Sequence, residues 1–218
     1  MKPLLIYCYD AYCGWCYGFS SVLTRFWSSF KEQYDVEVLS AGMILPGKPA
    51  HIGLIAAHMR ESCQAVSSLS GVAFGADFMW HINDPAQSDW YPDSRKPAIA
   101  LNILKEYFPE EQVQLAADIQ HLLFGEGRDL CDDEAYRELL HNYQVPPEEF
   151  FKKLHSETYR EKAYEEFALV KQLKVTGYPA LLLNMAGGKY YHVCNGYTNY
   201  ENLLTRLNTI IEKTVTSH

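Results

Sequence analysis

The sequence lacks a second cluster of residues that could complete a metal site. One pair of cysteines, Cys13 and Cys16, is separated by two residues, whereas the remaining cysteines are single. The eight histidines include no pair at the spacing of zinc ligands. A structural zinc ion needs four ligands, commonly from a second closely spaced cysteine pair or a histidine pair. We therefore predict no metal site, and the cysteine pair needs another explanation.

Long apolar runs are also absent. No segment approaches the roughly 18 apolar residues of a membrane-spanning helix, so we expect no membrane partner. The apolar run at residues 4–9 is shorter than the core of a secretory signal, and Asp10 follows it at once. We interpret this run as a first β-strand. We expect a cytoplasmic protein, whose cysteines are mostly thiols in that reducing compartment.

Lysine and arginine are few and scattered. The chain has 19 of them against 27 aspartates and glutamates, which gives a net charge of −8. This balance predicts no nucleic-acid partner, because such proteins present a basic patch. With 218 residues, of which 48% are hydrophobic and 21% charged, the chain can bury a core without metal or disulfide cross-links.

The most informative feature that is present is Cys13-Gly14-Trp15-Cys16, between the apolar run and a stretch with helical spacing. The N-terminus of a helix stabilises negative charge through its unpaired N–H groups and its dipole, which favours a thiolate there. The thiolate is the species that attacks disulfides. The motif therefore predicts a redox site that needs no cofactor, with Cys13 as nucleophile and Cys16 as resolving thiol.

Periodicity divides the chain into three parts. The first 43 residues read strand, helix, strand, with strands at 4–9 and 35–40. Strand signals then fade until about residue 159. Helices are predicted there at 51–67, 95–108, 110–124, 132–142 and 147–155, with an irregular aromatic tract at 78–92. The last part predicts a helix at 159–173, strands at 180–184 and 190–194 joined by a hairpin loop at 187–189, and a helix at 199–212.

This order resembles the thioredoxin fold, and the helical middle resembles its DsbA branch. Residues 9–19, which contain the cysteine pair and Trp15, are similar to the start of the cytoplasmic, FrnE-like DsbA relatives described as predicted protein-disulfide isomerases. Residues 124–130 resemble a turn in their helical domain. The resemblance implies an α/β thioredoxin fold, with residues 1–43 and 160–218 as the thioredoxin-like domain and residues 44–159 as an inserted all-helical domain.

The resemblance also implies the activity and further site residues. The activity is that of a thiol-disulfide oxidoreductase or isomerase acting on protein or small-molecule thiols and disulfides, glutathione among them. Pro179 is expected to be cis and to lie against the cysteines, with the backbone of Tyr178 pairing with an extended substrate. Trp15 is expected to be exposed and to contact the substrate. Since Gly14-Trp15 contains no histidine, we expect a less oxidising pair than that of periplasmic DsbA.

The remaining candidate residues are Asp10 and the four single cysteines. Asp10, three residues before Cys13, is a proton acceptor for Cys16 if it is buried, or else a solvated or capping carboxylate. The single cysteines Cys8, Cys63, Cys131 and Cys194 are expected to be small buried side chains, the middle two on helical segments.

Two other functions stay open at this point. The kappa-type glutathione transferases and the hydroxychromene carboxylate isomerases share the inserted-helix architecture, but they generally carry serine in place of the nucleophile and no second cysteine. A binding module that only holds a partner through the groove around Trp15 and Pro179 is the third alternative. Such a module would be indifferent to the redox state of its cysteines.

Overall fold

A mixed four-stranded sheet forms the centre of the computed structural model, which describes residues 2–185 and 189–215. The strands are β1 (Leu4–Tyr9), β2 (Asp35–Ser40), β3 (Ala180–Met185) and β4 (Lys189–Asn195), in the order β2-β1-β3-β4. β1 and β2 are parallel, and the other two pairs are antiparallel. The four predicted strands are confirmed. Of the predicted hairpin loop at 187–189, only Lys189 lies within the described residues, where it begins β4.

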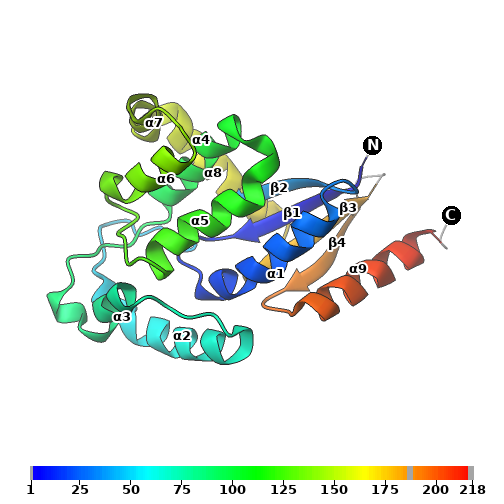
Figure 1. Cartoon of the computed structure of the whole chain (residues 1–218), viewed down its shortest axis with the longest axis horizontal. Coiled ribbons are helices and arrows are strands. Elements are labelled where there is room, and N and C mark those ends of the chain that lie inside the picture. The colour runs from blue at the N-terminus through cyan, green and yellow to red at the C-terminus, as the bar shows by residue number, and fades with distance from the viewer. Residues whose placement is uncertain (1, 186–188, 216–218) are drawn as a thin grey trace.

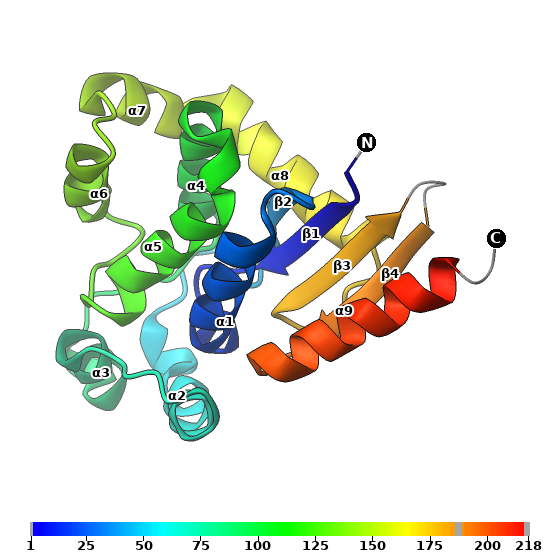
Figure 2. The same ribbon diagram turned by 45° about the vertical axis from the view of Figure 1, so that its right-hand side comes forward.

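The alternation of side chains along β1 gives the sheet two buried faces. Leu5, Tyr7 and Tyr9 belong to the large core that also contains the buried side of α1 (Gly14–Phe30). Ile6 and Cys8 belong to a smaller core on the opposite face, against α8 (Glu157–Gln172). The last helix, α9 (Tyr200–Val215), lies on the same face as α1 (Figure 2). The motif helix therefore rests directly on the central strand.

The helices between β2 and α8 gather at one side of the sheet (Figure 1). They are α2 (Ala56–Ser70), α3 (Ala76–Asn83), α4 (Arg95–Tyr107), α5 (Gln112–Phe124), α6 (Arg137–Asn142) and α7 (Pro147–Leu154). The five predicted helices are confirmed, although the first and the fourth begin about five residues later than predicted, after separate 3-10 turns at Ile52–Leu54 and Asp133–Tyr136. Within the described parts of the chain, none of the helices has the length and apolar character needed to cross a bilayer.

The aromatic tract predicted as irregular, 78–92, begins inside α3 (Ala76–Asn83), so that prediction was wrong for residues 78–83. The helix has only eight residues, so its periodicity is too short to stand out in the sequence. It is stabilised by tertiary packing of Phe78 and Ile82, four residues apart and both fully buried. The irregular character is confined to the residues that follow, up to Trp90 and Tyr91.

Gly18 allows α2 to pack closely across the start of α1. A Cβ atom at this position would lie 2.6 Å from Cγ1 of Val66 and 3.0 Å from Oγ of Ser70, both on α2. These distances leave no room for a larger residue. Because α2 approaches so closely, it forms a wall beside the first turn of α1, where the two cysteines lie.

Candidate active site

Cys13 occupies the N-cap position of α1. Its backbone is extended (φ −86°, ψ 103°), and its Sγ accepts a hydrogen bond from the backbone N–H of Cys16 at 3.2 Å. An N-cap side chain that accepts from the first turn is stabilised when it carries negative charge. The residue is 5% exposed. The geometry predicted for the nucleophile, a thiol at the start of a helix, is thus present.

Cys16 lies on the first turn of α1 and faces the sheet, with no exposed surface. Burial raises the pKa of its thiol well above the usual range, and the hydrogen bond with Cys13 and negative charge on Cys13 raise it further. The backbone of Asp10 acts in the opposite direction. Cys16 is therefore protonated at neutral pH, so it must lose a proton before it can act as a nucleophile.

Asp10 is buried, with 1% of its surface exposed, which excludes the solvated alternative. Its Oδ1 accepts from Tyr12 N (3.0 Å) and Ser94 Oγ (3.0 Å), and its Oδ2 accepts from Met43 N (2.7 Å). Burial raises the pKa of the carboxyl, although these hydrogen bonds act to lower it. Among the described residues Asp10 has no ion pair. It is held by neutral donors beside the thiols.

Gln120 on α5 fixes the turn that carries the motif. Its side-chain amide donates to the carbonyl oxygens of Asp10 (3.0 Å) and Cys13 (3.2 Å). The turn is closed by a hydrogen bond from Cys13 N to Asp10 O at 3.0 Å. Neither Gln120 nor Ser94 was predicted. The one available signal for Gln120 was a polar residue on the apolar side of a helix, 1% exposed next to the fully buried Ile119.

A cavity of about 390 Å³ opens beside Cys13. Its wall is formed by the motif, the segment after β2, α2 and the end of α5. The lining residues are Tyr12, Cys13, Gly14, Trp15, Met43, Ile44, Ile55, His58, Met59, Glu61, Ser62, Cys63 and Phe124. Trp15 lines the cavity, but it is half-buried, so the prediction of an exposed ring was wrong. The reason is that its ring packs against Tyr197, with 6.3 Å between ring centroids.

Tyr178 and Pro179 directly precede β3 and are joined by a cis peptide bond, as the resemblance implied. Pro179 is buried, and its carbonyl accepts from Gly196 N at 2.7 Å. Burial is the largest cause of the raised pKa of the half-buried Tyr178. Negative charge on nearby groups raises this pKa further, in the order Cys8, Asp10, Cys16 and Cys13. The loop is therefore close to the thiols, although it does not line the cavity.

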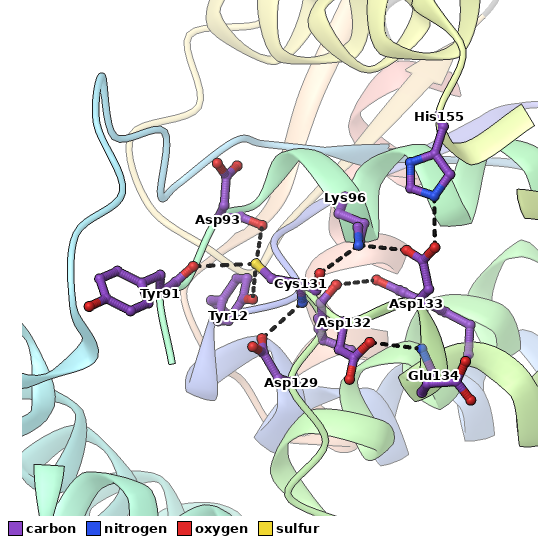
Figure 3. A network of polar contacts seen from close by, with 12 residues as sticks. Tyr12, Tyr91, Asp93, Lys96, Asp129, Cys131, Asp132, Asp133, Glu134 and His155 are labelled. Carbon is purple, nitrogen blue, oxygen red and sulfur yellow. Dashed lines mark hydrogen bonds and ion pairs between the residues drawn. The ribbon is translucent and has the colours of Figure 1, made fainter. Parts of the chain in front are cut away.

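The single cysteines fall into two groups. Cys8, Cys63 and Cys194 are buried, as predicted. Cys131 is partly exposed and lies in a turn, so the prediction of a buried helical residue was wrong. Its thiol donates to Tyr91 O (3.4 Å) and faces the Tyr12 hydroxyl at 3.5 Å, while Lys96 binds its carbonyl (Figure 3). These backbone and side-chain contacts, together with nearby acidic residues, fix the turn at the surface.

All six cysteines lie within the described residues and are free thiols. No group of three histidine, cysteine, aspartate or glutamate side chains in that part of the chain could hold a metal ion. The site therefore consists of two thiols, a buried carboxyl and an adjoining cavity.

Comparison with solved structures gives the fold. A putative protein disulfide isomerase from Nitrosomonas europaea superposes with a TM-score of 0.81 at 21% identity, over 98% of this chain and 99% of that chain. The cytosolic disulfide reductase DsbM from Pseudomonas aeruginosa with GSH gives 0.73 at 23% identity, over 96% and 99%. A 2-hydroxychromene-2-carboxylate isomerase gives 0.64 at 12% identity, over 98% and 97%.

No curated protein matches the sequence. The model of the family described as "DSBA-like thioredoxin domain" matches residues 5–208 of this chain. Apart from Leu4, this range includes all four strands, and it includes the motif and the helices between β2 and α8, so the predicted thioredoxin fold of the DsbA type is confirmed. The chain belongs to the DSBA-like thioredoxin domain family.

Proposed function

We propose that this protein is a thiol-disulfide oxidoreductase that works through Cys13 and Cys16. The observation that carries the proposal is the hydrogen bond from Cys16 N to Cys13 Sγ, at the N-terminus of α1 and at the edge of the cavity. This arrangement stabilises a thiolate at a point that a substrate can reach. The substrates are protein or small-molecule disulfides and thiols.

The reaction has two exchange steps. The Cys13 thiolate attacks one sulfur of a substrate disulfide R–S–S–R′, so a Cys13–S–S–R bond forms and R′–S⁻ leaves. Cys16 loses its proton to Asp10 and attacks Cys13 Sγ, which forms the Cys13–Cys16 disulfide and releases R–S⁻. The leaving thiolates take up the protons. The substrate gains two electrons and the enzyme loses two, which an external thiol or dithiol restores.

The remaining site residues have binding roles in this proposal. Trp15 presents its ring to the cavity and contacts the group attached to the attacked sulfur. The backbone at Tyr178 and Pro179, which precedes β3, pairs with an extended substrate segment as a short added strand. We place the protein in the cytoplasm, in line with the cytosolic location in the name of the Pseudomonas aeruginosa relative.

The first prediction tests the two thiols. Cys13→Ser abolishes disulfide reductase activity, whereas Cys16→Ser accumulates a mixed disulfide with one substrate half per enzyme, detectable by intact-protein mass spectrometry. Cys63→Ser is the matched control, because this thiol lines the same cavity but burial raises its pKa to about 12. We expect wild-type turnover from it. Wild-type turnover by Cys13→Ser would refute the proposal.

A glutathione-dependent isomerase or transferase is the second candidate. The likeness to the hydroxychromene carboxylate isomerase and to DsbM with GSH supports it, together with a cavity beside Cys13. Binding of glutathione to the reduced protein, with conjugation or isomerisation that survives in Cys16→Ser, would favour this candidate. Loss of all activity in that variant except mixed-disulfide formation would favour the oxidoreductase.

The direction of electron flow follows from the reduction potential of the Cys13–Cys16 pair. A value near that of thioredoxin, about −270 mV, makes the protein a reductase, and a value near about −120 mV makes it an oxidant. Gly14-Trp15 favours the reducing end, since the motif adds no cationic side chain to stabilise the thiolate.

A further inference from the structure

Tyr7 carries a buried hydroxyl that the fold does not use. The residue lies in the middle of β1, paired with Val38 on one side and Leu181 on the other, and is 2% exposed. Its Oη is fully buried and forms no hydrogen bond of normal geometry among the described residues, and the side-chain interaction that raises its pKa is with Cys16. A buried donor without an acceptor costs roughly 1–3 kcal/mol of stability. Phenylalanine would fill the same space without this cost.

The surroundings of Tyr7 point to the resolving thiol. Its ring packs against Phe19 on α1, with 6.1 Å between ring centroids. Phe19 follows Cys16 by one helical turn on the side of α1 that faces the sheet, and both are fully buried. Burial raises the pKa of the Tyr7 hydroxyl, and negative charge on Cys16 has the next largest effect, followed by Cys13. The hydroxyl is thus a neutral donor beside the sulfur of Cys16.

We infer that Tyr7 is a positioning residue for the resolving step, in which its hydroxyl donates a hydrogen bond to the Cys16 thiolate. A thiol sulfur is a weak acceptor, whereas an ionised acceptor forms roughly twice as strong a bond. The donor therefore stabilises Cys16 selectively when it has lost its proton. The inference rests on the proposed function, because it concerns the second exchange step of that reaction.

The chemistry of the step stays balanced. The proton of Cys16 moves to Asp10 and then to the released R–S⁻, while Tyr7 keeps its own proton throughout. The S–S bond between Cys13 Sγ and the substrate sulfur breaks as the Cys13–Cys16 disulfide forms, and R–S⁻ leaves. Tyr7 contributes only a hydrogen bond, which a residue chosen for packing would not provide.

Tyr9 provides a matched control. It lies two residues further along β1 on the same face, and the two ring centroids are 5.7 Å apart. Its hydroxyl is also fully buried without a hydrogen bond of normal geometry, and the side chain that interacts with it is Ser40. Burial is the largest cause of the raised pKa of Tyr9. Negative charge on Asp10 and on Glu166 has the next largest effects, and Cys16 has a smaller one. Removing the Tyr9 hydroxyl tests for a general effect of an altered core.

The experiment follows the two steps separately by stopped flow, with the aromatic disulfide 5,5′-dithiobis(2-nitrobenzoate) as probe. The first equivalent of released thiolate reports attack by Cys13, and the second reports resolution by Cys16. In Tyr7→Phe we expect the second phase to slow about tenfold, the first phase to change less than about twofold, and the pH profile of the second phase to shift upward. Thermal stability should be unchanged or higher.

Three results would overturn the inference: a second phase within about twofold of wild type in Tyr7→Phe, an equal loss in the first phase, or an equal effect in Tyr9→Phe. If Tyr7→Phe fails to fold, 3-fluorotyrosine at position 7 replaces it. Its more acidic hydroxyl is a stronger donor and should accelerate the second phase, and an unchanged rate would contradict the inference. A wild-type protein without a first phase would instead refute the proposed function.

Discussion

Two buried carboxyl groups, Asp10 and Glu166, differ in how their negative charge is stabilised. Glu166 on α8 lies 2.8 Å from Nζ of Lys105, which also binds Glu37 Oε1 (2.6 Å) and Val38 O (2.7 Å). Asp10 has only neutral donors and lies beside the thiols. Burial raises the pKa of both groups.

This difference indicates that the charge on Glu166 stabilises the fold, whereas the charge on Asp10 affects the chemistry of the thiols. The charge on Glu166 is compensated by a buried cation, and together they join α4 and α8 to β2, where Glu166 also accepts from Ser40 N at 2.9 Å. The charge on Asp10 has no such cation within the described chain, so it acts on its neighbours. We expect mutations at the first pair to change stability alone, and mutations at Asp10 to change stability and thiol chemistry.

The largest effect on stability is expected from Lys105→Met. Removing the cation leaves Glu166 buried without compensation, which costs about 3–5 kcal/mol. Urea denaturation measures the free energy of unfolding, and the rate of Cys13 alkylation should stay unchanged. Adding Glu166→Gln to Lys105→Met should recover most of the loss. A double variant no more stable than the single one would contradict the role of the ion pair.

The next effect is expected from Asp10→Asn. The amide group places an N–H against at least one backbone N–H that now donates to Asp10, which costs about 1–3 kcal/mol. Loss of the proton acceptor should slow resolution by Cys16 at least about tenfold. Faster resolution in Asp10→Asn would contradict this role. The charge on Asp10 raises the pKa of Cys16, so a carboxylate that acted only by repulsion would slow resolution in the wild type.

The pH dependence of stability follows from the same carboxyl. The folded-state pKa of Asp10 lies above the ordinary value of 3.8, so the folded state binds the proton more tightly than the unfolded state. Its contribution to stability is therefore lost as pH rises from 3.8 through the folded pKa. The free energy of unfolding of the wild type minus that of Asp10→Asn should fall as pH rises through this range. A difference that grows with pH would mean a depressed folded pKa.

The sequence predicted the order of elements and the chemical centre because both are local patterns. Cys13 and Cys16 are close in the chain, and the strand and helix that present them have clear periodicities. The partners of Asp10 are distant. Ser94 lies 84 residues away, and Gln120, which holds the Asp10 carbonyl, lies 110 residues away. Only the packing of α4 and α5 brings these side chains to the motif.

The same limit explains the error at Trp15 and the absence of any prediction for Tyr7. The motif places Trp15 at the start of a helix, but whether its ring is covered depends on Tyr197, far along the chain. Alternation along β1 places Tyr7 on the same face as Leu5 and Tyr9, yet it does not tell whether its hydroxyl finds a partner. That depends on how α1 lies across the strand, which places Phe19 and Cys16 above it.

The smallest effect is expected from Glu106→Gln, which extends the comparison to a surface carboxylate. Burial acts to raise the pKa of Glu106, but hydrogen bonds from Lys162, Tyr159 and Lys153 lower it to about 2. The side chain is 37% exposed, so water and salt screen these contacts and the substitution should cost less than about 1 kcal/mol.

The pH dependence has the opposite sign to that of Asp10. The stabilisation from Glu106 is present above its ordinary pKa of 4.5 and is lost as pH falls towards about 2. The free energy of unfolding, measured by urea denaturation, should therefore differ between wild type and Glu106→Gln by an amount that rises with pH. This difference should shrink in 1 M salt. A salt-independent loss would mean that Glu106 is held like Glu166, as part of a buried pair, because only solvated charges are screened at this ionic strength.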